Sequence, residues 1–298
     1  MWGAMGDTLE NRASRSSDAE VYAQQLALSH ILREPVLRSA IKALHLPPGS
    51  RGLDAGCGVG HVTLMLAEAV GHKGHCTGLD LSAPFVARAR EISTKSPLSG
   101  QVSFQQGNVQ ALPFDDHHFD WLWSSDCVGY PAREPVLLLK ELSRVVKPEG
   151  TVAILMWSSQ QLLPGYPLLE ARLNATAAGM APFTSEMEPK LHALRALGWF
   201  RDAGLEDPLV HTFVGTVHGP LSDDTRSALI SLFDMRWKDA EPEMAPEAWA
   251  QYERLCQPES PNFILDLSDY YAFFTYSLFR GKVGKTTEGI KNLEVDHG

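Results

Sequence analysis

LDAGCGVG, residues Leu53 to Gly60, is the stretch of sequence that decides the fold of this chain. Its glycines, Gly56, Gly58 and Gly60, stand at alternate positions after a short apolar strand. Because glycine has no Cβ, these positions can adopt positive φ and let the backbone approach a ligand closely. The next residues, 61–70, carry apolar side chains at helical spacing, so the turn leads into a helix whose first N–H groups face the same space. A strand, a glycine turn and a helix in this order predict a nucleotide site.

The position of the third glycine separates two kinds of nucleotide. A dinucleotide fingerprint reads G-x-G-x-x-G, whereas here His61 occupies the last position of that pattern and Gly60 comes one residue early. This spacing disfavours a pyrophosphate and hence a nicotinamide-dependent oxidoreductase, which stays open as an alternative.

Further segments follow in the order that such a fold requires. HCTGLD, residues 75–80, is a short strand that ends in Asp80, whose carboxylate can accept hydrogen bonds from both ribose hydroxyls. QGNVQALPFDDHHFD places Asn108 and Val109 after a third strand and opens a fourth strand at its end. ELSRVVKPEGTVAIL, residues 141–155, reads as a helix, a turn and a fifth strand.

Together these motifs resemble those of the class I S-adenosylmethionine (SAM) dependent methyltransferases, of the type found in ubiquinone and menaquinone biosynthesis. The resemblance covers roughly residues 22–157. It implies an α/β fold with a Rossmann-like, seven-stranded, mostly parallel sheet, helices on both faces and a helical lid. It also implies SAM as cofactor and methyl transfer to a small, fairly apolar organic metabolite. A protein that binds SAM without transferring its methyl group is a second alternative.

The resemblance assigns a task to each motif position. Asp54 would orient the glycine loop and the methionine ammonium, Asp80 would hold the ribose, and Leu81 would lie against the adenine. Asn108 stands where an aspartate is commoner, but its amide oxygen can still accept a hydrogen bond from the adenine amino group. The cofactor-binding residues implied in this way are Tyr22, Asp54, Gly56, Gly58, Asp80, Leu81, Asn108, Val109 and Ser124, the last through its carbonyl.

Methyl transfer from a sulfonium is an in-line displacement, so positioning and desolvation can supply much of the rate. A general base helps where the acceptor is a hydroxyl or an activated carbon. The candidate catalytic residues are Asp126 and Tyr130, just past the predicted fourth strand, and His30 in the N-terminal helical segment, with Asp126 first. Local hydrogen bonding or packing is the competing interpretation for each of them.

Composition restricts the partners. A formal net charge of −10 disfavours a phosphate-rich polymer such as nucleic acid. The four cysteines show neither a paired framework nor C-x-x-C spacing, so we expect neither disulfides nor a metal site. The first residues are too polar for a signal peptide, and no apolar run reaches the roughly 20 residues of a membrane span. We therefore expect a cytoplasmic protein that acts on a small molecule, with no membrane partner. The oligomeric state and the acceptor atom, whether O, N, C or S, stay open.

The pattern divides the chain into an N-terminal helical segment at 1–46, a methyltransferase domain at 47–284 and a flexible tail at 285–298. Pro35 is expected to break the first segment into two short helices. Two lid insertions are predicted at about 159–186 and 219–268.

Between a predicted sixth strand at 209–217 and a last strand at 272–283, a helical stretch at 222–255 is much longer than a hairpin turn. Insertions of such length are commonly functional. Another helical stretch is expected at 162–180, and a third at 190–200. The aromatic residues of this part either line an acceptor pocket or form the core of the lid, and we expect the core role for most of them.

Overall fold

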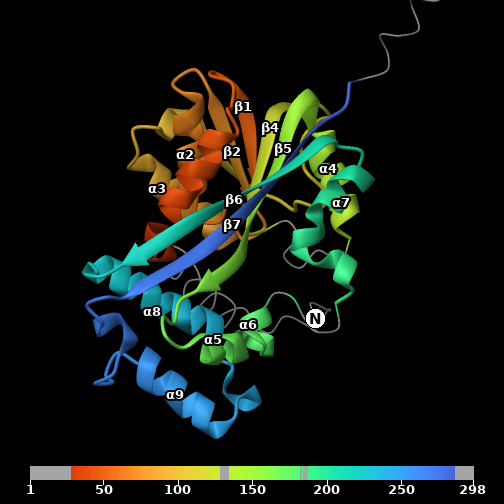
Figure 1. The fold of residues 1–298 in the computed structure, drawn as a ribbon. Helices are drawn as coiled ribbons and strands as arrows, with labels where there is room; N and C mark the ends of the chain where they lie inside the picture. Colours follow the sequence, from red (N-terminus) through yellow and green to blue (C-terminus); the bar gives the residue numbers. More distant parts are fainter. Residues whose placement is uncertain (1–27, 128–133, 182, 184–186, 286–298) are drawn as a thin grey trace, which may run out of the picture.

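The computed structural model describes residues 28–127, 134–181, 183 and 187–285. Within these residues the strands are β1 Arg51–Ala55, β2 His75–Asp80, β3 Val102–Gln106, β4 Phe119–Ser125, β5 Val146–Gln161, β6 Glu206–His218 and β7 Tyr271–Lys282. They form a seven-stranded sheet in the order β3-β2-β1-β4-β5-β7-β6 (Figure 1). β1 to β5 pair in parallel with one another, whereas β7 is antiparallel to both β5 and β6. The predicted mostly parallel α/β sheet is therefore confirmed.

Helices cover both faces of this sheet. They are α2 His61–Val70, α3 Ala83–Thr94, α4 Pro135–Arg144, α5 Pro167–Asn174, α6 Ala177–Met180, α7 Ala196–Asp202, α8 Asp223–Trp237 and α9 Pro246–Cys256, preceded by a helical segment at 28–43. In Figure 1, α2 and α3 lie on one side of the strands, and α4 and α7 lie on the other. The strands between them are buried on both faces, as in β1, where the four residues after Arg51 are buried.

The N-terminal helix differs from the prediction. Residues 28–43 form one helix that continues through Pro35, so the expected break there is wrong. A proline in a helix removes one hydrogen bond, here the one to the carbonyl of Ile31, and that residue is exposed, so water can replace the bond. Val36 and Leu37, directly after the proline, are buried with the rest of one apolar face, and this packing stabilises the helix across it.

The parallel strands end at the edge where the other helices gather. β5 pairs with β4 only as far as Leu155 and then continues along β7 to Gln161, so its last residues extend beyond the rest of the parallel sheet. In Figure 1 the arrowhead of β5 points toward α5, α6 and α8 at the lower end of the view. The end of β5, residues 156–161, therefore extends toward these helices and overhangs the parallel sheet.

Beyond β5 the helical expectations are correct in kind and wrong in extent. The expected helix at 162–180 starts only at Pro167, and Glu170 accepts hydrogen bonds from the N–H groups of Leu162 and Leu163 ahead of it. It is divided into α5 and α6 at Thr176, whose side chain caps α6 by accepting from the N–H of Gly179. The stretch at 190–200 is mostly tight turns before α7, and the one at 222–255 is α8 and α9. β6 and β7 lie where the last two strands were predicted.

Most aromatic residues of the lid region belong to its own core. Phe233, Trp237, Phe263 and Tyr270 are buried in the large cluster that also contains the N-terminal helix and α2. The others differ: Trp199 and Phe200 pack on the α4 and α7 face, Trp249 is half-buried, and Tyr271 is exposed. The predicted core role therefore holds for most of the set.

Candidate functional site

A cleft of about 280 Å³ lies at the carboxyl ends of β1 and β4. Its walls include the glycine loop at 56–59, Asp80 at the end of β2, and the residues Ser125 to Cys127 that follow β4. His30 and Arg33 of the N-terminal helix close one side. In open α/β sheets this edge is where ligands bind, because the loops that leave the strands diverge there.

The glycine loop has the backbone that its sequence predicts. Gly56, Gly58 and Gly60 have φ values of 81°, 53° and 87°. The N–H groups of Gly56 and Cys57 both donate to the carbonyl of Leu79, at 2.8 and 3.0 Å, which ties the loop to the end of β2. A Cβ at Gly56 would overlap the Sγ of Cys127, so a side chain is excluded there by space as well as by φ.

Asp54 lies beneath this loop and is fully buried. One carboxylate oxygen, Oδ2, accepts a hydrogen bond of 2.7 Å from the hydroxyl of Thr63, whereas Oδ1 has no hydrogen-bond partner among the described residues. Burial, together with the negative charge of Asp80, raises the pKa of Asp54 to about 7, although the hydrogen bond from Thr63 acts in the opposite direction. A positively charged ligand group above the loop would stabilise the ionised form, and the methionine ammonium of SAM is such a group.

Asp80 is the second acid of the cleft. Its Oδ2 accepts a hydrogen bond of 2.9 Å from the N–H of Gly58, and its Oδ1 accepts one of 2.9 Å from the N–H of Ser82. Each carboxylate oxygen can accept more than one hydrogen bond, so Asp80 can hold the loop and ribose hydroxyls together. Ser82 caps α3 by accepting from the N–H of Phe85, as expected from the sequence.

The predicted adenine contacts lie directly after β2 and in the loop after β3. Leu81 is 67% exposed although it is apolar, which leaves a surface that a flat ring can cover. Asn108 is exposed and its amide oxygen accepts a hydrogen bond of 2.9 Å from the N–H of Gln110. Val109 is half-buried and packs against the cluster on the α4 face. The oxygen of Asn108 is therefore already shared with its own turn before any ligand binds.

Ser124 is fully buried within β4. Its hydroxyl donates to the carbonyl of Ala55 at 2.7 Å, and this contact links β4 to the strand that precedes the glycine loop. Its side chain is thus committed to the sheet, and the predicted ligand contact concerns only the carbonyl.

Asp126 connects several elements at the cleft. It follows β4 with a φ of 47°, in the left-handed region that asparagine and aspartate tolerate better than most residues. Its Oδ2 accepts from Arg33 at 2.7 Å and from the hydroxyl of Tyr276 at 3.2 Å, and its Oδ1 accepts from the N–H of Trp157 at 3.0 Å. One carboxylate thus joins the N-terminal helix, β5 and β7 to the end of β4.

His30 stacks on His61, the first residue of α2, with ring centroids 4.5 Å apart. Burial, together with the neighbouring His61, lowers the pKa of His30 to about 4, although Glu34 acts in the opposite direction. The pKa of His61 is also lowered, chiefly by burial. Both rings are therefore neutral near pH 7. Tyr22 and Tyr130, also predicted as site residues, lie outside the described residues.

Arg33 and Cys127 are among the cleft residues that the sequence prediction missed. Arg33 lies one helical turn after His30, and that spacing was the available signal. Cys127 packs on Gly56, but nothing in a lone cysteine indicates this contact. Burial raises the pKa of Cys127 to about 12, so it is a thiol near pH 7 and not a nucleophile.

The sequence of this chain is similar to those of known methyltransferases. Residues 53–150 match a family model described as a methyltransferase domain. The demethylmenaquinone methyltransferase of Bacillus pumilus is 33% identical over 193 residues, which cover 59% of this chain and 80% of that protein. The chain belongs to the class I SAM-dependent methyltransferases. This methyltransferase uses SAM as its cofactor, so the predicted enzyme class and cofactor are confirmed and the nicotinamide alternative is not.

Other relatives agree with this assignment. The Bacillus licheniformis enzyme of the same name is 31% identical over 194 residues, 59% of this methyltransferase and 79% of the relative. The one from Bacillus cytotoxicus is 36% identical over 132 residues, which span 43% of this chain and about half, 53%, of that protein.

Solved structures share the fold. The YcgJ protein from Bacillus subtilis has a TM-score of 0.51 and 19% identity, covering 84% of this methyltransferase and 98% of that chain. A putative methyltransferase complexed with the Haloferax volcanii Trm112 activator has a TM-score of 0.51 and 17% identity, covering 90% and 96%. None of the described helices of this methyltransferase has the length and apolar character that a membrane span requires.

Proposed function

We propose that this methyltransferase transfers the methyl group of SAM to a small, largely apolar, quinone-like molecule. Its relatives are named after demethylmenaquinone, which is therefore the first acceptor to test. The acidic net charge of −10 supports a small molecule over nucleic acid as acceptor, and we place the reaction in the cytoplasm.

The observation that carries this proposal is that a hydrogen bond joins the walls of two hollows. A second hollow of about 400 Å³ lies beside the overhang of β5, between α6, α8 and the turns before α7. Trp157 lines this hollow, and its N–H donates to Asp126, which lines the cleft. A methyl donor in the cleft and an acceptor in the hollow would lie on either side of this contact, and we propose that the two hollows open to each other there, as an in-line transfer requires.

The cofactor-binding residues keep their predicted tasks in this proposal. Bound SAM supplies the methyl group on its sulfonium. Asp54 and the carbonyl of Ser124 face the ammonium, Gly56 and Gly58 pass beneath the methionine part, and Asp80 accepts from the ribose. Leu81, Asn108 and Val109 surround the adenine, and Arg33 adds a positive charge suited to the methionine carboxylate. Tyr22 stays a prediction for that same end.

Asp126 is better suited to position the cleft than to accept a proton. Arg33 and Tyr276 already donate to its Oδ2 and the N–H of Trp157 to its Oδ1, which leaves little acceptor capacity for a substrate hydroxyl. His30 is neutral near pH 7, as a base must be, but a pKa near 4 makes it a weak one. Tyr130 stays a prediction. We therefore propose that positioning and exclusion of water supply most of the rate.

The lid is part of the same proposal. We propose that the segments at about 159–186 and 219–268 cover the acceptor within the methyltransferase domain at 47–284. The position of α5, α6 and α8 at the carboxyl edge of the sheet supports this division (Figure 1).

The test has two stages. Calorimetry should detect micromolar binding of SAM and of S-adenosylhomocysteine but not of NAD. Tritium transfer from methyl-labelled SAM to reduced short-chain demethylmenaquinone, against simple phenols and a blank, should then identify the acceptor class. Binding of SAM without transfer to any ring compound would refute the proposed acceptor.

A second measurement separates the two roles of Asp126. If it acts as a base, Asp126→Asn should reduce kcat by roughly 10²- to 10⁴-fold, whereas Arg33→Gln should act mainly on KM. If it positions the cleft, both variants should have effects of similar size, and the double variant should be little worse than either one.

A further inference from the structure

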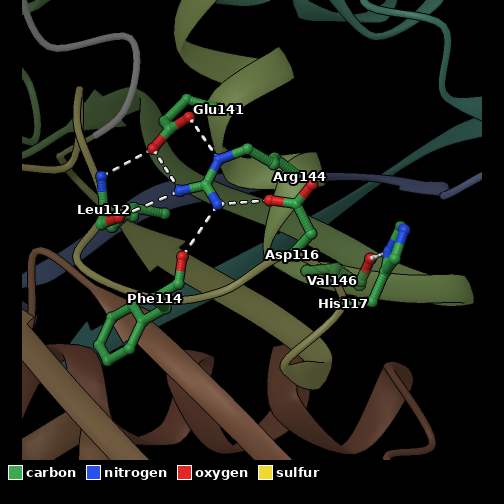
Figure 2. Close-up of polar contacts among 7 residues, drawn as sticks. All are labelled: Leu112, Phe114, Asp116, His117, Glu141, Arg144 and Val146. Carbon is green, nitrogen blue, oxygen red and sulfur yellow. Dashed lines mark hydrogen bonds and ion pairs between the residues drawn. The ribbon is translucent and has the colours of Figure 1, made fainter.

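The loop between β3 and β4 is held from the side opposite the cofactor cleft. Arg144, the last residue of α4, donates from Nη2 to the carbonyl of Leu112 at 3.0 Å and from Nη1 to the carbonyl of Phe114 at 2.9 Å. Nη1 also donates to the Asp116 carboxylate at 2.7 Å. Figure 2 shows the guanidinium at the centre of these contacts. One side chain thus binds every second residue of the loop from Leu112 to Asp116.

Glu141 completes the arrangement from one turn earlier on α4. Its Oε1 accepts from Nη2 of Arg144 at 2.9 Å, and its Oε2 accepts from Nε at 3.0 Å (Figure 2). The same Oε1 accepts from the N–H of Leu112 at 2.7 Å. Both backbone polar groups of Leu112 are therefore bound by the Glu141–Arg144 pair, and its side chain is buried among the residues of the α4 face.

The ion pair is mutual. The hydrogen bond from Arg144 lowers the pKa of Glu141, and the bond to Glu141 raises the pKa of Arg144. Because the guanidinium is planar and carries its donors in a fixed fork, it can bind a carboxylate on one edge and carbonyls on the other. A lysine at the same place has a single charged nitrogen and cannot reproduce this geometry.

A tight turn connects this anchored segment to the end of β2. The carbonyl of Asn108 accepts from the N–H of Ala111 at 3.1 Å, and its side chain accepts from the N–H of Gln110 at 2.9 Å. At the other end, the N–H of Gly107 donates to the carbonyl of Asp80 at 2.9 Å. The turn 108–111 is thus fixed to β2 on one side, and it ends at the residue before Leu112 on the other.

We propose that Glu141 and Arg144 are positioning residues for adenine recognition. They hold Leu112, Phe114 and Asp116 so that the turn presents Asn108 and Val109 to the adenine ring, without touching the cofactor themselves. This inference rests on the proposed function, in which Asn108 and Val109 contact the adenine.

The experiment compares two nucleosides that differ at the group that Asn108 would recognise. Affinities for S-adenosylhomocysteine and S-inosylhomocysteine are measured by calorimetry well below the unfolding temperature, for the wild type and for Asn108→Ala, Arg144→Lys and Glu141→Gln. We expect the wild type to prefer the adenosyl compound by roughly tenfold, which corresponds to one hydrogen bond. The preference should disappear in Asn108→Ala and fall several-fold in Arg144→Lys, while the affinity for the inosyl compound changes little.

Glu141→Gln keeps the acceptor for Leu112 but removes the charge, so it is the milder variant and serves if Arg144→Lys does not fold. Lys147→Ala is the matched control, because it removes an exposed ion pair with Asp120, 2.7 Å, near the same end of α4. It should leave the preference unchanged.

The outcomes separate the two proposals. Equal loss of affinity for both nucleosides in the Arg144 and Glu141 variants, with a lower unfolding temperature, would show a role in stability alone and overturn the inference. A wild type that binds both nucleosides equally would overturn it as well. A wild type that binds neither would instead refute the cofactor site.

Discussion

The loops at the carboxyl ends of β1, β2 and β4 differ from the lid region in what holds them together. In these loops the contacts described above are between backbone groups and a few short polar side chains, as where the N–H of Gly58 donates to Asp80. In the lid, large side chains such as Trp237 and Tyr252 pack against one another. Backbone contacts need particular residues at particular positions, whereas apolar packing accepts many combinations of similar volume. Family motifs are therefore readable in the first region and absent from the second.

This difference predicts where substitutions act. Changes in the glycine loop should abolish cofactor binding, and changes in the lid core should reduce stability while leaving cofactor binding intact.

The largest effect is expected for Gly56→Ala. The new Cβ would overlap Cys127, and a φ of 81° adds strain of about 1–2 kcal/mol, so the loop must move. We expect the affinity for S-adenosylhomocysteine, measured by calorimetry, to fall by at least roughly 100-fold. Gly71→Ala is the control: its φ is 73°, but nothing lies within 4 Å of the added Cβ. It should lose stability without losing affinity, and similar affinities in the two variants would contradict the role of the loop.

Asp80→Ala should have the next largest effect. Loss of a charge-assisted contact with the ribose is expected to weaken binding of SAM by about 1.5–3 kcal/mol. Ser82→Ala removes the cap of α3, at a cost of about 1 kcal/mol of stability, and touches no ribose. If its affinity for SAM falls as far as that of Asp80→Ala, the effect comes from the helix rather than from the ribose contact.

The pH dependence of binding tests Asp54. Its pKa in the free protein is raised from 3.8 to about 7, so the carboxyl is protonated below that pH, and a cationic ligand favours the ionised form. The affinity for SAM should therefore fall as the pH drops below 7, by up to about tenfold per pH unit. In Asp54→Asn this slope should vanish. A flat profile in the wild type between pH 5.5 and 7, a range of about 1.5 units, would count against an ionised Asp54 in the complex.

The same shift has a consequence for stability. The folded protein binds a proton at Asp54 that the unfolded chain releases once the pH exceeds 3.8. The contribution of Asp54 to the free energy of unfolding should therefore decrease as the pH rises from 3.8 to about 7, and level off above it.

The smallest effect is expected in the lid. Trp237→Phe removes the hydrogen bond of 3.1 Å from the indole N–H to Asn174 and keeps an aromatic ring in the core. This should cost about 1 kcal/mol and lower the unfolding temperature by roughly 2–4 °C. The affinity for SAM should not change. Tyr271→Ala, at an exposed position, should alter neither quantity.

Much of the predicted cofactor site, with the glycine loop and the end of β2, could be predicted because each of its features depends on the residue type at one position. The positive φ of Gly56, the carboxylate at the end of β2 and the cap at Ser82 each follow from a residue type at one position. Pro35 misled the prediction because its local tendency to end a helix is outweighed by the burial of Val36 and Leu37 against distant residues.

Long-range contacts explain the rest. The ion pair of Asp126 with Arg33 joins residues that are 93 positions apart, and no spacing rule links them. The late start of the helix expected at 162–180 goes with the buried carboxylate of Glu170, a residue type that is normally found at the surface. The residues of the hollow beside β5 come from several separate segments and carry no common pattern.

The ladder between β6 and β7 has a consequence for how acceptor preference could change. His218 pairs with Tyr271, and the N–H of Gly219 donates to the carbonyl of Tyr270. The segment between these residues therefore leaves the sheet and rejoins it at the same end of the β6–β7 ladder. An excursion attached in this way can be exchanged for another of different length while the neighbouring strands stay in register. Related enzymes can then differ in the acceptor that they prefer while the strands and loops that bind SAM stay nearly the same.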